Sequence, residues 1–191
     1  MKRSRWVFGA IVGMALGWQT GSYATLVQAI PLADLIELSE SVVVATVVDS
    51  TSHYATVRGH RRMVTDTTLL VDHVITAKAP SAAPAQSIHV RTLGGTSDGV
   101  VQSVLGEAVL ETQSTNLLFL RRGSDGELWV AAMAQGEYPL ENTADGQSRL
   151  HASPGLDVVR NPEQSVVSVL SGTTLQQAET LVKTHLPKAR H

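Results

Sequence analysis

The sequence predicts a mainly β protein, a small antiparallel barrel with a short N-terminal helix and a C-terminal helix. Three observations carry this prediction. β-Branched residues gather into long runs near 41–48 and 64–76, shorter apolar runs follow between glycine-rich turns, and the composition is 43% hydrophobic and 17% charged. Many strands with helices only near the two ends favour an antiparallel barrel over an alternating α/β fold.

The first 24 residues predict a secretory signal peptide. Three basic residues lie within positions 1–5, an uncharged and mostly apolar stretch covers 6–18, and Ser22-Tyr23-Ala24 places small residues where a signal peptidase cleaves. We expect cleavage before Thr25 and an exported protein, secreted or periplasmic. The alternative is a short membrane anchor, although thirteen residues are too few to cross a bilayer as a helix.

Charge and aromatic content exclude a nucleic-acid partner for the exported chain. Removal of the first 24 residues takes away three positive charges, so the formal net charge moves from −2 to −5. Nucleic-acid binding proteins present a basic face, and single-strand binders stack bases on several aromatic side chains. The four aromatic residues that remain are scattered along the chain: Tyr54, Phe119, Trp129 and Tyr138. We also expect no membrane span after cleavage.

The chain contains no cysteine. This excludes disulfides, cysteine nucleophiles and thiolate metal sites together. An exported domain without disulfides depends on its core, and a domain of about 167 residues buries roughly two-thirds of its unfolded surface. No cofactor is expected.

The first elements expected are a short helix and two long strands. Residues 31–38 combine an early proline, early acidic residues and an apolar face, which is typical of a short helix. Residues 41–48 are mostly valine, which fits a strand buried on both faces or part of a closed barrel. The polar stretch 49–62 predicts a protruding hairpin end, and 64–76 predicts the second long strand.

Shorter strands are expected after a connector at 78–86, whose prolines and small residues do not suit a sheet. The glycine-rich turn 94–99 follows the first of them, and the turn 121–126 joins two into a hairpin. The expected segments are 88–93, 100–105, 116–120, 128–132 and a closing edge piece at 135–140.

Composition divides the exported chain into two parts. The β-barrel domain is expected at 25–140, and the more polar, glycine-punctuated stretch 141–191 is expected to be loosely structured. Within that stretch, Thr174 and Gln177 have the spacing of a capping box and precede an apolar stripe. The pattern predicts one C-terminal helix at about 173–186.

Three pieces of this pattern form a recognisable combination. They are the helix and valine-rich strand at 35–48, the strand at 67–75, and the strand with its glycine pair at 90–95 followed by the apolar strand 116–120. Together they resemble exported bacterial domains of uncharacterised function that are netrin-like, with an OB-type barrel. The resemblance covers about residues 30–140, and it implies that the apolar strand closes the barrel.

The netrin-like group includes the tissue inhibitors of metalloproteinases, to which this chain is similar in general fold only. Those inhibitors coordinate the protease zinc through an N-terminal cysteine held by disulfides. This chain has no cysteine, and its expected mature N-terminus is Thr25-Leu26, so no inhibitory residue carries over.

One dense positive cluster, Arg58, His60, Arg61 and Arg62, occurs in the exported chain, at the expected hairpin end. Guanidinium groups there can bind a carboxylate or an acidic partner through their forked donors. The alternative is a solvated turn whose charges keep the strand edge from pairing with another sheet.

Histidines are the candidate metal ligands, because an exported protein without cysteine binds zinc or copper through imidazole. His73 and His89 are the candidates, since they are expected on adjacent strands. The chain has no His-x-His, His-x-x-x-His or His-Glu-x-x-His motif. Ordinary surface histidines are therefore the alternative, and no metal site is assigned.

No catalytic residue is assigned either. The chain lacks a Gly-x-Ser-x-Gly elbow, and the turn 94–99 lacks the Lys-Ser/Thr of a phosphate loop and precedes a β-like run. Asp66 and Asp72, six apart in one strand, are about 20 Å from one another, too far for joint acid–base work. One enzyme hypothesis stays open, a hydrolase site assembled from loop residues around His53, His60 and Asp66.

The leading hypothesis is an exported, non-enzymatic module that binds another protein, with a protease of the same compartment as one candidate. It rests on the barrel pattern together with the lack of a recognisable catalytic motif. The hydrolase and the histidine-based, periplasmic metal-binding protein are the alternatives.

Overall fold

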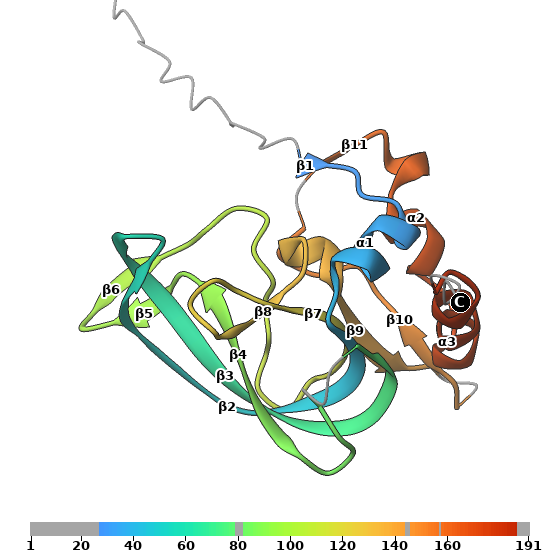
Figure 1. Cartoon of the computed structure of the whole chain (residues 1–191), viewed down its shortest axis with the longest axis horizontal. Coiled ribbons are helices and arrows are strands. Elements are labelled where there is room, and N and C mark those ends of the chain that lie inside the picture. The colour runs from blue at the N-terminus through green and yellow to red at the C-terminus, as the bar shows by residue number, and fades with distance from the viewer. Residues whose placement is uncertain (1–26, 79–81, 144–145, 157, 187–191) are drawn as a thin grey trace, which may run out of the picture.

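The computed structural model describes residues 27–78, 82–143, 146–156 and 158–186, so the predicted signal peptide lies outside the described residues. Figure 1 shows the elements, which are β1 (Val27–Gln28), α1 (Leu32–Leu38), β2 (Ser41–Val57), β3 (His60–Ala77), β4 (Ser87–Leu93), β5 (Gly95–Ser97), β6 (Val100–Gln102), β7 (Thr115–Arg122), β8 (Leu128–Val130), η1 (Met133–Gly136), β9 (Glu137–Asn142), β10 (Ser148–Leu150), β11 (Val159–Arg160), η2 (Pro162–Gln164), α2 (Val166–Leu170) and α3 (Leu175–Thr184).

A seven-stranded sheet forms the body of the protein, in the order β10-β9-β7-β2-β3-β4-β8. Neighbouring strands are antiparallel, except that β8 runs parallel to β4, and β8 also pairs antiparallel with β7. The prediction of a mainly β protein is confirmed in this form, one large sheet with few helices, which is a broader description than the small barrel predicted from the sequence.

The valine-rich start of β2 is buried on both faces, as its sequence predicts. Side chains alternate across a strand, so Val42 and Val44 join one apolar cluster while Val43 and Val47 join another. The first cluster also holds the apolar faces of α1, α2 and α3, and the second lies between β2, β3, β4, β7 and β8. Because neither face meets water, almost every position in this stretch is apolar.

The long hairpin of β2 and β3 turns through just two residues, Arg58 and Gly59. Both have positive φ, 50° and 79°, as a tight hairpin turn with two left-handed residues requires. Backbone pairing continues to Val57 and His60 beside the turn, so the polar stretch predicted as a hairpin end consists of paired strands. Figure 1 shows this end extending beyond the rest of the sheet, close to β5 and β6.

The stretch predicted as a strand at 100–105 is shorter in the structure. Only Val100–Gln102 is a strand, and it pairs with β5 in a small separate hairpin. Residues 103–114 cross irregularly to β7, with a left-handed turn at Gly106 (φ 76°).

The chain after residue 141 contributes to the first apolar cluster. Leu150 of β10, Val166 and Leu170 of α2, and Ala178 and Val182 of α3 are buried in it. The N-terminus of α3 carries a complete capping box between residues 174 and 177. Among the helices described, none has the length and apolarity needed to span a membrane.

Candidate functional site

A basic pocket lies between the tight turn of the β2–β3 hairpin and the turn that joins β7 to β8. Its cavity has a volume of about 420 Å³. We call it the arginine pocket and define it by its lining residues, which are Val57, Arg58, His60, Arg62, Leu93, Gln102, Val104, Glu107, Arg121, Gly123, Ser124, Asp125, Trp129, Val130 and Met133.

Three guanidinium groups, those of Arg58, Arg62 and Arg121, line this pocket. None of the three forms a hydrogen bond or ion pair with any residue that the structure describes. Arg61 instead stacks on Tyr54, with its guanidinium carbon 4.3 Å from the ring centre. The structure thus brings three members of the predicted cluster to one pocket, places Arg61 outside it, and adds Arg121 from β7.

Two carboxyl groups share the pocket with the arginines. Asp125 accepts a hydrogen bond from Trp129 Nε1 at 3.1 Å and one from the Glu127 backbone N–H at 3.3 Å. Glu107 is 7% exposed, and burial raises the pKa of its carboxyl, against the opposing hydrogen bonds from the backbone of Ala108 and Leu93 and the charge of Arg121. The three guanidinium groups outnumber the two carboxyl groups, so the lining has an excess of formal positive charge, which favours acidic ligands over basic ones.

The floor of the arginine pocket is apolar. Leu93, Val104, Val130 and Trp129 line it, and Trp129 is 9% exposed. Met133 adds a half-exposed thioether side chain. A ligand that joins a carboxylate to an apolar group fits this combination of charged rim and apolar floor.

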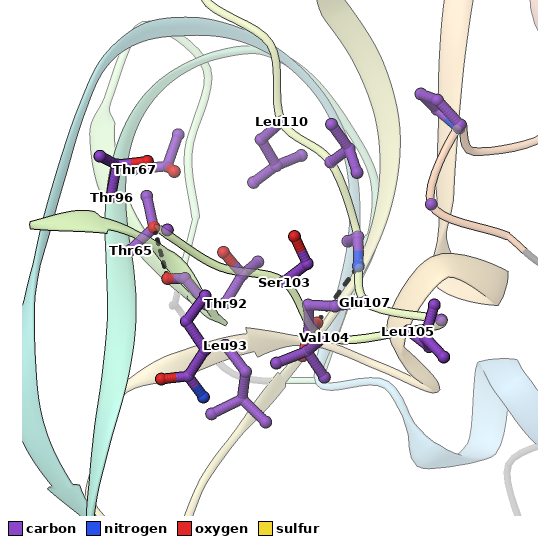
Figure 2. A pocket seen from close by; sticks show the side chains of 18 of the residues that line it. Thr65, Thr67, Thr92, Leu93, Thr96, Ser103, Val104, Leu105, Glu107 and Leu110 are labelled. Carbon is purple, nitrogen blue, oxygen red and sulfur yellow. Dashed lines mark hydrogen bonds between the residues drawn. The ribbon is translucent and has the colours of Figure 1, made fainter. Parts of the chain in front are cut away.

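A second, larger cleft adjoins the arginine pocket. Its volume is about 640 Å³, and Figure 2 shows its walls. We call it the threonine cleft and define it by its lining residues, Thr65, Thr67, Thr92, Leu93, Gly94, Gly95, Thr96, Val101, Gln102, Ser103, Val104, Leu105, Gly106, Glu107, Ala108, Val109, Leu110, Pro154, Gly155 and Leu156. Leu93, Gln102, Val104 and Glu107 belong to both sites.

The glycine pair allows β5 to cross directly over the long hairpin at the edge of this cleft. Gly94 has φ 90°, and a Cβ there would lie 2.6 Å from the carbonyl oxygen of Gln102. A Cβ on Gly95 would collide with the Ser52 and Thr65 side chains. The strands β5 and β6 follow, where a phosphate loop would require a helix, so this turn builds a cleft wall.

One buried carboxyl group, that of Glu137, holds the irregular segment 103–114 of the threonine cleft through hydrogen bonds. Glu137 Oε2 accepts hydrogen bonds from the Val109 backbone N–H at 2.7 Å and from Ser153 Oγ at 2.5 Å. The Glu137 side chain is fully buried, and this burial raises its pKa to about 7 although both hydrogen bonds act in the opposite direction. Glu137 thereby joins residues 103–114 to the loop around Ser153.

The residues of the hydrolase hypothesis are only partly brought together. His53 Nε2 lies 3.7 Å from Asp66 Oδ2. Arg91 binds both oxygens of Asp66, at 2.6 and 2.8 Å, and these hydrogen bonds lower the pKa of the Asp66 carboxyl, which makes it a weak base. His60 lies beside the hairpin turn, six residues from Asp66 and roughly 20 Å away along the strand.

His73 and His89 occupy separate places. His73 Nε2 lies 3.3 Å from Glu179 Oε1 on α3, and His89 Nδ1 lies 3.3 Å from Thr68 Oγ1. Thr68 and His73 are five residues apart on β3, so the two imidazoles do not meet. Within the described ranges no three His, Cys, Asp or Glu side chains are grouped closely enough to hold a metal ion.

Sequence reasoning missed Arg121 and the inward-facing threonines. The spacing Thr65-x-Thr67 on an alternating strand could have signalled the threonines, but Arg121 reaches the pocket from β7, which no local pattern relates to residue 58.

A scan against protein-family models finds no match to this chain, and a search of curated proteins finds none.

Proposed function

We propose that this protein is an exported, non-enzymatic binding module whose arginine pocket takes an acidic segment of another protein. The observation that supports it is the set of three guanidinium groups without a bonded partner among the described residues, placed around an apolar floor. Guanidinium groups bind carboxylates through paired, charge-assisted hydrogen bonds. An aspartate or glutamate beside an aliphatic residue is the expected recognition element.

The proposal includes an OB-like barrel as the scaffold. In the order β2-β3-β4-β8-β7 each strand pairs with the next, and β7 pairs back with β2. This cyclic order, with β4 and β8 parallel, supports a five-stranded closure of the OB type.

Export and the class of partner are also part of the proposal. The three-part pattern of residues 1–24 supports export. A protease of the same compartment remains the candidate partner. The separation of His60 from the pair His53 and Asp66, and the engagement of Asp66 by Arg91, favour binding over hydrolysis.

The test uses two pools of N-acetylated hexapeptides. One pool carries Asp or Glu beside Leu or Val, and the other carries Asn or Gln at the same position. Trp129 is the single tryptophan after residue 24 and lines the pocket, so its fluorescence in the exported chain reports binding. We expect the acidic pool to bind at least about tenfold more tightly, because charged hydrogen bonds are lost in the amide pool.

Matched variants locate the site. Combined replacement of Arg58, Arg62 and Arg121 by Ala removes the pocket cations, and we expect it to abolish the preference for the acidic pool. The control is Arg61→Ala, which removes a neighbouring guanidinium that stacks on Tyr54 outside the pocket. Should the triple variant fail to fold, as judged by circular dichroism, Arg62→Gln alone serves in its place. Equal binding of both pools, or an unchanged preference in the variants, would overturn the proposal.

A further inference from the structure

The inward face of β3 and β4 changes from aliphatic side chains to threonines along its length. Leu69 and Val71 on β3 and Val90 on β4 belong to the second apolar cluster. Further along the same face, the structure has Thr67 and, on β4, Thr92. Threonine has nearly the shape of valine, so the change adds hydroxyl groups without filling more space, and burying a hydroxyl without a partner is unfavourable.

The hydroxyl groups of Thr67 and Thr92 have no hydrogen-bond partner in the part of the chain that the structure describes. Their side chains are nearly enclosed, with residue exposures of 1% and 6%. Neither hydroxyl is among the fully enclosed unpartnered atoms, so each opens into the threonine cleft. Thr65 differs, because its hydroxyl donates to the Gly94 carbonyl at 2.9 Å and lies 2.9 Å from Ser52 Oγ.

The opposite wall of the cleft is aliphatic. Figure 2 shows Thr67 and Thr92 on one side of the space and Leu110 and Val104 on the other. At the margin, Leu105 and other aliphatic side chains are unusually open to solvent, with Val101 71% exposed and Leu105 60% exposed. We take this aliphatic margin as part of the binding surface, because a ligand in the cleft would cover it.

A peptide backbone has the hydrogen-bonding groups that suit the side of the cleft formed by Thr67 and Thr92. A threonine hydroxyl both donates and accepts, and a peptide unit offers one N–H donor and one carbonyl acceptor. An uncharged side chain of the same segment would lie against the aliphatic wall. The cleft also adjoins the arginine pocket, because Leu93, Gln102, Val104 and Glu107 line both.

We propose that the threonine cleft is a second subsite for the same partner segment, with Thr67 and Thr92 hydrogen-bonding its backbone and the aliphatic wall receiving an uncharged residue. This inference rests on the proposed function, since it places the acidic residue of the segment in the arginine pocket. The ligand class is thus an extended peptide that carries an acidic residue followed by uncharged aliphatic residues.

The test compares two peptides on the exported chain. An acidic tripeptide reaches only the arginine pocket, whereas a decapeptide with the same acid followed by aliphatic residues also reaches the cleft. The variants Thr67→Val and Thr92→Val remove one hydroxyl each and keep the side-chain shape. The control is Thr68→Val, the neighbouring residue on β3 whose hydroxyl meets His89 instead of the cleft.

We expect each cleft variant to weaken decapeptide binding about three- to tenfold, the effect of one lost hydrogen bond, while tripeptide binding stays unchanged. Replacing one amide of the decapeptide by an ester should weaken wild-type binding and have less effect in the matching variant. If the tripeptide binds but the cleft variants bind the decapeptide like wild type, the inference is wrong and the proposed function stands. If neither peptide binds, both are wrong.

Thermal melting of the free variants provides an independent readout. Valine should leave the free protein as stable as wild type or more stable, because a hydroxyl kept for a ligand does not stabilise the unliganded fold. A lower melting temperature in both variants would show that these hydroxyls serve the fold, for example through bound water, and would overturn the inference.

Discussion

The two ends of the long β2–β3 hairpin differ in burial and polarity. Near Ser41–Val47 most β2 side chains are buried, and the valines there enter two apolar clusters. Near the turn, from Ser50 to Thr67, hydroxyls, imidazoles and guanidiniums predominate, and many of these side chains are half exposed. The hairpin is therefore a scaffold at one end, and the proposed function makes its other end the recognition surface. Substitutions can separate the two roles.

The largest expected effect lies in the scaffold. Phe119 on β7 is fully buried and packs edge-on against Tyr138, with ring centroids 6.2 Å apart. Phe119→Ala should lower the free energy of unfolding by about 3–5 kcal/mol, because it removes buried apolar surface and leaves a cavity. Urea denaturation measures this. The control is Val101→Ala at the β5–β6 hairpin, where the residue is 71% exposed and the loss should stay below about 0.5 kcal/mol.

The next effect depends on pH and arises at Glu137. Burial raises the pKa of its carboxyl from an ordinary 4.5 to about 7, so the folded protein binds a proton more readily than the unfolded chain. The resulting stability is complete below pH 4.5 and is lost as the pH rises towards 7. The free energy of unfolding should fall by at most about 3 kcal/mol over this pH range.

Glu137→Gln tests this origin, because the amide still accepts hydrogen bonds but does not titrate. Urea denaturation between pH 4 and 8 should show a smaller decline for this variant than for the wild type. The parallel variant Glu141→Gln, on the exposed part of β9, should retain the full decline. Equal pH profiles for wild type and Glu137→Gln would contradict the assignment.

A smaller effect is expected at the junction between scaffold and recognition surface. Gly95 has φ 129°, a conformation that side chains with Cβ rarely adopt, and a Cβ would meet Ser52 and Thr65. Gly95→Ala should cost about 2 kcal/mol, measured by thermal melting. Gly99→Ala is the control, because Gly99 has φ 75° but open space around an added Cβ. It measures the cost of the positive φ alone, so its loss of stability should be smaller. Equal losses would show that the contact with the long hairpin is unimportant.

The sequence predicts the scaffold end better than the recognition end, for physical reasons. The consecutive valines near residue 43 predict a strand with little exposed surface, buried on both faces or part of a closed barrel, because exposed positions would favour polar residues. Arg58, His60 and Arg62 were identifiable because they are neighbours in the chain. Arg121 was not, since only the curvature of the hairpin brings its tip to the β7–β8 turn.

The irregular segment 103–114 also escaped the sequence analysis, in which its first residues were predicted to extend a strand. Val100, Val101 and Val104 have strand-forming side chains, but the backbone N–H of Val109 is bonded to the Glu137 carboxyl instead of to a neighbouring strand. A hydrogen bond between residues 28 positions apart leaves no local pattern. The identity of Thr67 as a cleft residue depends likewise on which face of β3 points inward.

The arginine pocket is bounded by two tight turns that lie outside both apolar clusters. Its ligand preference can therefore be changed by exchanging a few residues in or near these turns, such as Arg58, Arg62 and Ser124, while the valines that hold the sheet together remain in place. A library randomised at these positions would yield proteins of similar melting temperature but different ligand preference. The fold would then serve as a cysteine-free framework for engineered recognition in oxidising surroundings, where no thiol could form an unwanted crosslink.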